Sequence, residues 1–134
     1  MKKTEEAKKI LKALGLPNAQ QNEMAALTLL ALCNIKKNNS WENSQRKSLG
    51  LTKGIISFVN KNYQKTYAPN TRESFRKDVL HYFVQARIAD YNSDNPEHLE
   101  RFTLLLSQVL KNSKNLQMIL LGKLKFGYPN FQII

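Results

Sequence analysis

The chain has 134 residues, the usual size of one compact domain, and its 21 lysine and arginine residues outnumber 10 aspartate and glutamate residues, giving a formal net charge of +11 at pH 7. Its single cysteine excludes an internal disulfide, and no run of 18 consecutive apolar residues predicts a membrane span. The mostly charged residues 1–12 do not resemble a signal peptide, so we expect a cytoplasmic protein that makes no contact with a membrane.

The positive charge surrounds one short acidic stretch. Residues 51–87 carry seven basic and two acidic side chains, a net charge of +5, and residues 101–134 carry five basic side chains and no acidic one. Residues 88–100 carry four acidic side chains and no basic one. A balance this basic favours a polyanionic partner, and nucleic acid is the commonest polyanion available to a cytoplasmic protein.

Two helices are predicted in the first third of the chain. Apolar residues at helical spacing predict a first helix over residues 4–14, capped by Thr4 and ended by Gly15. A second helix is predicted over residues 18–33. It is apolar enough to form the centre of the core, and Cys33 at its end is expected to be a small buried hydrophobic residue rather than a reactive thiol.

A polar loop and a third helix are expected next. Residues 36–48 predict the loop, in which Trp41 packs its ring back onto the core. The apolar pattern resumes over residues 52–63 and predicts a helix. A turn follows, because Pro69 forces the residue before it out of the helical region.

The segment Asn70-Thr71-Arg72-Glu73 predicts the start of a fourth helix that continues to about residue 86. Asn70 would cap this helix while the Glu73 side chain reaches back to the cap, as in a capping box. Two helices joined by a short turn, with basic residues early in the second, are typical of a helix-turn-helix unit. A strand over residues 88–91 and a turn over 92–96 follow. We therefore expect a mainly α, winged-helix-like helix-turn-helix domain with a candidate short β-wing.

The fourth helix is predicted to have one apolar and one polar side. In a recognition helix, early residues of the exposed arc meet base edges and flanking basic residues meet phosphates. The apolar side is formed by Phe75, Val79, Tyr82, Phe83 and Ala86. The polar arc is formed by Asn70, Thr71, Ser74, Lys77, His81 and Gln85.

Five further basic residues complete the predicted DNA-binding set. Lys53, Lys61 and Lys65 lie on the preceding helix and in the turn. Arg72 and Arg76 fall nearer the buried side of the fourth helix than its exposed side. Two alternatives stay open for this pair: contact with DNA phosphates past the end of the core, or pairing with acidic side chains inside the domain.

The same segments resemble the N-terminal domain of the BsuBI/PstI-type restriction endonucleases, over roughly residues 8–96. The resemblance implies a helix-turn-helix domain joined to a C-terminal nuclease of the PD-(D/E)xK type, which uses Mg²⁺ to cut both strands of DNA. The matching stretches are Gln20–Glu23, Ala26–Leu32, Trp41, Tyr67–Glu73, Phe75-Arg76, His81, Phe83–Ala86, Tyr91-Asn92 and Asn95-Pro96.

The sequence departs from this family pattern in two places. Arg87 stands where the family usually has a glycine after the helix, so a left-handed cap there is expected to be strained or replaced. Residues 97–134 do not resemble the continuation of the family. We expect a helix-turn-helix domain over residues 1–96 and, over residues 97–134, either a tail with helices near 104–110 and 116–121 or a non-native end that lacks the nuclease domain.

No catalytic or metal-binding residue is predicted. A Mg²⁺-dependent nuclease needs clustered carboxylates and a lysine beside the attacking water. The tripeptide Glu6-Ala7-Lys8 matches (D/E)-x-K only formally, and no acidic residue follows Glu100. Asp90, Asp94, Glu97 and Glu100 lie in a turn-rich stretch and favour an exposed acidic loop. We therefore expect this chain alone to hold no cofactor and not to cut DNA, with Mg²⁺ needed only by the full-length family enzyme.

Three classes of function are compatible with these features. The favoured one is the DNA-binding domain of a BsuBI/PstI-type type II restriction endonuclease, as a truncated or degenerate copy. The second is a stand-alone winged-helix transcriptional regulator whose tail helices make a dimer. The third is a module that uses its basic face on another protein. Double-stranded DNA is the expected partner, and a second copy of the chain is a further candidate.

Overall fold

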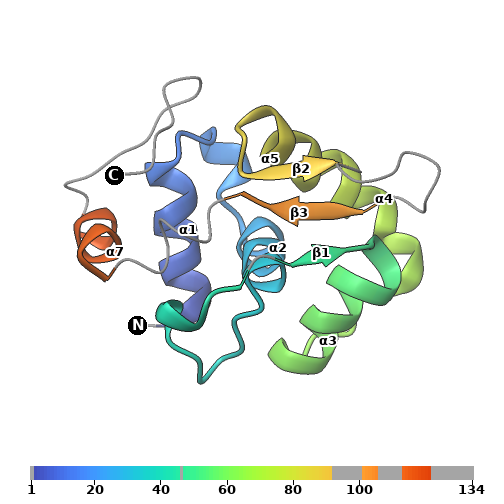
Figure 1. The fold of residues 1–134 in the computed structure, drawn as a ribbon. Coiled ribbons are helices and arrows are strands. Elements are labelled where there is room, and N and C mark those ends of the chain that lie inside the picture. Colours follow the sequence, from blue (N-terminus) through green and yellow to red (C-terminus); the bar gives the residue numbers. More distant parts are fainter. Residues whose placement is uncertain (1, 46, 92–100, 106–112, 122–134) are drawn as a thin grey trace.

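The computed structural model describes residues 2–45, 47–91, 101–105 and 113–121. Helices and a small antiparallel sheet form one core, which confirms the predicted fold class (Figure 1). In chain order the helices and strands are α1 Lys3–Ala13, α2 Glu23–Cys33, β1 Ser48–Leu49, α3 Ser57–Tyr63, α4 Arg72–Phe75, α5 His81–Gln85, β2 Ala89–Tyr91, β3 Phe102–Leu104 and α7 Ser113–Leu120.

In the part of the chain that the structure describes, no helix is both long and apolar enough to cross a membrane.

Short helical turns lie beside or between several of these elements. The 3₁₀ turns are Asn18–Gln20, Trp41–Asn43 and Pro69–Thr71, and the π-helical turns are Leu51–Ile56 and Arg76–Leu80.

Helix α1 begins one residue earlier than its sequence predicts. Lys2 precedes its first turn and no side chain caps it, so the prediction of Thr4 as the cap is wrong and Thr4 lies inside the helix. Glu5 and Glu6 in the first turn favour this start, because carboxylates stabilise the positive end of the helix dipole. Gly15 ends the helix as predicted, with a φ of 88°.

Helix α2 is the centre of the core, as its apolar sequence predicts. Every residue from Ala25 to Cys33 is buried, including Thr28, whose hydroxyl donates to the Met24 carbonyl at 2.8 Å. The predicted start at residue 18 is wrong, because Asn22 caps the helix with a side chain that accepts from the Ala25 N–H at 2.9 Å. Cys33 is buried, which confirms its predicted role.

The other helices surround α2. Helix α1 packs on one side of it, and α3 and the π-helical turn Arg76–Leu80 pack on others. Trp41 anchors the loop before β1 as predicted: it is 3% exposed, and its Nε1 donates to Glu6 Oε1 at 3.2 Å. Because neighbouring elements cover α2 on several sides, its faces are apolar all round.

The sheet has the strand order β1-β3-β2, with both pairs antiparallel, and it lies in front of α2 in Figure 1. Strand β2 confirms the strand predicted over 88–91, whereas β1 was not predicted and its first residue, Ser48, was expected to end a loop. Leu104 was expected to begin a helix but pairs with Ala89 as the last residue of β3. The rest of that predicted helix, and the turn predicted over 92–96, lie outside the described residues.

Helix α7 corresponds to the helix predicted over 116–121, begins at Ser113, and packs on α1 through the buried Leu116 and Ile119. Strand β3 likewise pairs with strands from earlier in the chain. The predicted domain boundary at residue 96 stays a prediction. Strand β3 and helix α7, which follow residue 96, pack against elements that precede it.

Candidate nucleic-acid interface

Residues 69–85 form one continuous helical rod, which we call the recognition helix. It consists of the 3₁₀ turn Pro69–Thr71, α4, the π-helical turn Arg76–Leu80 and α5. These segments follow one another without a gap, and the residues at each junction have right-handed helical backbone angles, so the rod is unbroken. Together with the helical residues 51–63 it makes the helix-turn-helix unit.

The recognition helix has the two faces that its sequence predicts. Phe75, Val79, Leu80 and Phe83 are at most 1% exposed and pack into the core beside α2. Tyr82 and Ala86 are half-buried at the edge of this face. On the opposite side Asn70, Lys77, His81 and Gln85 are exposed, and Thr71 and Ser74 are half-buried. We call this opposite side the polar arc.

The start of the recognition helix corrects the predicted capping box. Pro69 occupies the first helical position after Ala68, and no side chain caps the turn. Proline suits this position because its ring fixes φ and its missing N–H needs no partner. Asn70 therefore lies inside the helix, and the Thr71 hydroxyl donates to the Ala68 carbonyl.

Glu73 pairs with Arg76 instead of reaching back to the helix start. The Arg76 guanidinium donates to both carboxylate oxygens of Glu73, and this hydrogen bonding holds the pKa of Glu73 below its usual range. Both side chains are about half exposed, at 47% for Arg76 and 62% for Glu73. Of the two alternatives for Arg76, the acidic partner is therefore real, but it lies on the surface rather than inside the domain.

The turn between the two helices is held by a pair of residues that the sequence did not indicate. The Asn60 side chain accepts from the Tyr67 N–H at 3.0 Å and donates to the Tyr67 carbonyl at 2.9 Å. The Tyr67 ring meets Phe75 edge-on, with centroids 5.2 Å apart. No local signal could have found this pair, because the two residues meet only after the chain reverses at Gln64, where φ is 55°. The pair fixes the angle at which the recognition helix leaves the turn.

Comparison with known proteins assigns this unit to a family. The family model described as the BsuBI/PstI restriction endonuclease HTH domain matches residues 1–101. The chain belongs to this family. The sequence is 50% identical over 91 residues to the type II restriction enzyme BsuBI of Bacillus subtilis, and 33% identical over 91 residues to the type II restriction enzyme AplI of Arthrospira platensis.

A solved structure agrees with this membership. The structure of the SdaI restriction endonuclease matches 85% of this chain with a TM-score of 0.74 and 29% sequence identity. The chain spans 40% of the SdaI chain, and its matches to BsuBI and AplI cover 68% of this chain and 28% of each enzyme. The similarity thus concerns the helix-turn-helix part of these enzymes.

The backbone at Arg87 tests the prediction of a left-handed cap at this position. Arg87 adopts a left-handed φ of 59°, the conformation that a glycine takes without strain. The Arg87 N–H bonds to the Val84 carbonyl at 3.2 Å, and the Ile88 N–H bonds to the Phe83 carbonyl at 2.8 Å. This is a complete Schellman cap, so the left-handed cap is kept with an arginine at the position where a glycine would adopt this conformation without strain.

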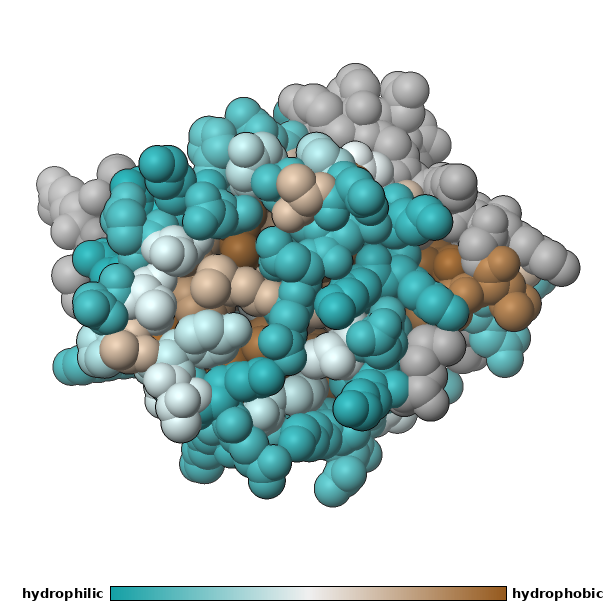
Figure 2. Space-filling view, turned by 180° about the vertical axis from the view of Figure 1, so that it is seen from behind, coloured by the Kyte–Doolittle hydropathy of each residue, from teal (hydrophilic) through white to brown (hydrophobic). Residues whose placement is uncertain are grey.

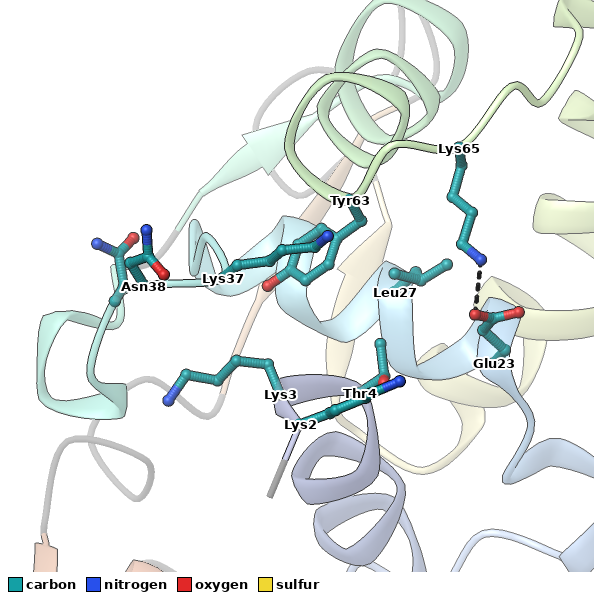
Figure 3. A pocket seen from close by; sticks show the side chains of 10 residues that line it. Lys2, Lys3, Thr4, Glu23, Leu27, Lys37, Asn38, Tyr63 and Lys65 are labelled. Carbon is teal, nitrogen blue, oxygen red and sulfur yellow. Dashed lines mark ion pairs between the residues drawn. The ribbon is translucent and has the colours of Figure 1, made fainter.

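The three predicted lysines outside the recognition helix are separated in space. Lys53 lies near Arg72, and Lys61 is exposed on α3. Lys65 forms an ion pair of 2.8 Å with Glu23 at the start of α2, and the hydrogen bond that its ammonium donates to Glu23 raises the pKa of Lys65 (Figure 3). Lys65 therefore fastens the turn to the core helix and does not join the polar arc.

Lys65 and Glu23 line a hollow of about 530 Å³ (Figure 3). Its floor includes Leu27 and Tyr63, and the Tyr63 hydroxyl donates to the Ile35 carbonyl at 2.6 Å. The remaining side chains around it are Lys2, Lys3, Thr4, Lys37, Asn38 and Asn39.

The acidic side chains that the structure describes form no cluster of the kind that holds a metal ion. Among the described residues, no group of three or more histidine, cysteine, aspartate or glutamate side chains could hold a metal ion. Glu6 of the formal (D/E)-x-K tripeptide accepts a hydrogen bond from Trp41 and pairs with Lys3 at 3.5 Å. Asp90 is exposed on β2, while Asp94, Glu97 and Glu100 lie outside the described residues.

Proposed function

We propose that this BsuBI/PstI-type helix-turn-helix domain binds double-stranded DNA through the polar arc of its recognition helix. The observation that carries the proposal is that this helix has one buried face and one exposed polar face. One face is sealed into the core, and the other presents Lys77, His81 and Gln85 to solvent beside the exposed Asn70. The major groove of DNA admits an α-helix, and side chains of this chemistry form hydrogen bonds with its base edges.

Each part of the polar arc suits a different task. Asn70 stands in the first turn of the helix, where residues of a helix-turn-helix unit contact base edges, and an asparagine amide can pair with adenine. Thr71 and Ser74 offer short hydroxyls, which suit phosphate oxygens or base edges. Lys77 and His81 lie one and two turns further along, where a basic side chain meets phosphates or guanine. The net charge of +5 over residues 51–87 supports the same ligand.

The test is a titration of the full chain with a fluorescent duplex of mixed sequence at several salt concentrations. We expect affinity to fall steeply as salt rises, because counterions released from DNA drive such binding. Affinity that does not change between low and moderate salt contradicts the proposal.

We also propose that the chain recognises DNA without cutting it, and that Mg²⁺ serves the nuclease part of the full-length family enzymes. The carboxylates of the described residues are engaged in ion pairs or scattered, as given above for Glu6, Glu23 and Glu73. Supercoiled plasmid incubated with the pure chain and Mg²⁺ is expected to stay intact. Metal-dependent nicking that disappears when Asp90, Asp94, Glu97 or Glu100 is changed overturns this part.

A second copy of the chain is the proposed protein partner. Figure 2 shows apolar residues gathered at the edge of the molecule that carries α7 in Figure 1, where Met118 is 37% and Leu121 is 67% exposed. Two copies would place two recognition helices on two half-sites. Sedimentation equilibrium of the chain and of its Leu121→Ser variant tests this, since only the parent chain is expected to dimerise. The proposed DNA ligand supports a cytoplasmic location for the domain.

A further inference from the structure

Three cationic side chains from separate segments line one groove beside the recognition helix. The groove has a volume of about 500 Å³, and its cations are Lys53, Arg72 and Arg101. Lys53 belongs to the π-helical turn before α3, Arg72 begins α4, and Arg101 precedes β3. Along the chain Arg101 is 48 residues from Lys53 and 29 residues from Arg72, so the fold alone brings it to this groove.

The groove has a built wall. The Arg101 guanidinium donates from Nε to Ser48 Oγ at 3.2 Å and from Nη2 to the Ser48 carbonyl, which holds it against β1. Gly54 lets the helix beginning at Leu51 approach β1 closely, because a Cβ there would stand 3.0 Å from the Leu49 Cβ. The walls are Leu49, Gly50, Leu51, Thr52 and Gly54.

The charge of the groove is strongly one-sided. Among the described residues that line it there are three cations and no carboxylate, and all three cations are exposed to solvent. The hollow beside Lys65 is lined by four lysines and by Glu23, which pairs with Lys65. Both recesses are cationic, and the groove is the one that reaches the recognition helix, through Arg72.

We propose that this groove holds a backbone phosphate of double-stranded DNA, gripped jointly by Lys53, Arg72 and Arg101. The inference rests on the proposed function and adds the phosphate site that sets the register of the recognition helix. Arg72 stands two residues after Asn70, so a phosphate held there fixes where the first turn of the helix enters the groove of the duplex. Arg101 ties the same phosphate to the sheet, so the sheet and the recognition helix would engage DNA together.

The experiment uses the full chain and compares Lys53→Gln, Arg101→Gln and the double variant with Lys9→Gln. Lys9 is exposed on α1 and does not line the groove, so its variant removes the same charge elsewhere. We expect each groove variant to lose about tenfold in affinity and to lower the salt slope by about 1, while Lys9→Gln changes neither. The double variant is expected to lose less than the product of the single losses, because both side chains grip one phosphate.

The outcomes separate this inference from the proposed function. If the parent chain binds DNA but the groove variants behave as Lys9→Gln does, the phosphate site is wrong and the proposed function stands. If the parent chain does not bind DNA, the proposed function fails first. Fully multiplicative losses in the double variant contradict a shared phosphate. Should Arg101→Gln not fold, Lys53→Glu decides, with a larger loss expected than for Lys53→Gln.

A further arm tests the source of the phosphate. Inorganic phosphate is expected to displace DNA no better than chloride does at equal ionic strength. Binding of inorganic phosphate that Lys53→Gln abolishes but that leaves the DNA affinity of the parent chain unchanged would identify a site for a free anion and overturn the assignment to DNA.

Discussion

Helix α2 and the recognition helix both contribute apolar side chains to the core, yet they serve opposite purposes. Helix α2 is buried from Ala25 to Cys33 on every face, because the other elements surround it. The recognition helix is buried on one face and carries Lys77 and His81 on the other. The difference shows that a helix at the centre of a small domain can only stabilise the core, whereas a helix at its edge has an exposed face that can bind a ligand.

The largest expected effect comes from the buried face of the recognition helix. Phe83 is fully buried, so Phe83→Ala should lower the free energy of unfolding by about 3–5 kcal/mol through lost packing and the cavity left behind. Urea denaturation measures it. The fully buried Leu30→Ala variant of α2 is the matched control, with an expected loss of about 2–5 kcal/mol. A loss below about 1 kcal/mol for Phe83→Ala would mean that the two faces are reversed.

The exposed face should respond in the opposite way. Lys77→Ala is expected to weaken DNA binding about tenfold and to lower the salt slope by about 1, because one cationic contact is lost. Its free energy of unfolding should stay within about 0.5 kcal/mol of the parent, as for other surface changes. Fluorescence anisotropy and urea denaturation measure the two quantities. Unchanged DNA affinity would remove Lys77 from the predicted site.

The burial of α2 predicts a loss of stability in alkali. Burial raises the pKa of the Cys33 thiol from 9.0 to about 12, and burial also raises the pKa of Tyr63. Above pH 9 the unfolded chain releases the thiol proton while the folded chain keeps it, so stability is complete below pH 9 and falls as pH rises towards 12. We expect a loss of about 1 kcal/mol between pH 9 and pH 10.

Cys33→Ala is the control for this pH dependence. It should flatten the stability curve between pH 9 and pH 10, although the variant is less stable at every pH. Parallel curves for the two proteins would show that another group titrates. In the folded parent, the Cys33 thiol should also react with a disulfide reagent only as fast as the chain unfolds.

The smallest effect compares the ends of the two helices. Arg87 after the recognition helix and Asn34 after α2 both have a left-handed backbone, with φ values of 59° and 57°. Arg87→Gly should raise the free energy of unfolding by about 0.5–1 kcal/mol, since relief of strain exceeds the added flexibility of the unfolded chain. Asn34→Gly should gain less, because asparagine tolerates this conformation. Thermal unfolding measures both, and equal gains would contradict the strain at Arg87.

Local sequence signals were accurate where one helix explains them. The two faces of the recognition helix, the burial of Cys33 and the anchoring of Trp41 follow from helical spacing and side-chain chemistry. The predicted caps at Thr4 and Asn70 were each wrong by two positions. Several residues near a helix start can serve as its first residue, and packing against the neighbouring elements selects among them.

Contacts between distant segments could not be predicted in this way. Strand β1 has two residues and no pattern of its own, and it is a strand because β3 lies beside it. The groove of Lys53, Arg72 and Arg101 joins three segments that are separate in the sequence. Lys65 was placed with the DNA-binding residues, but it pairs with Glu23, a partner that no spacing along the chain indicates.

The sequence by itself determined a basic, mainly helical chain, the burial of α2 and the polar arc of the recognition helix, since charge and the helical repeat are properties of neighbouring residues. Tertiary structure alone decided which cations converge, which acidic side chains neutralise them, and how the Asn60–Tyr67 pair sets the recognition helix on the core. The physical reason is that hydrogen bonds and ion pairs act over a few ångströms in space, and the folded path of the chain sets those distances.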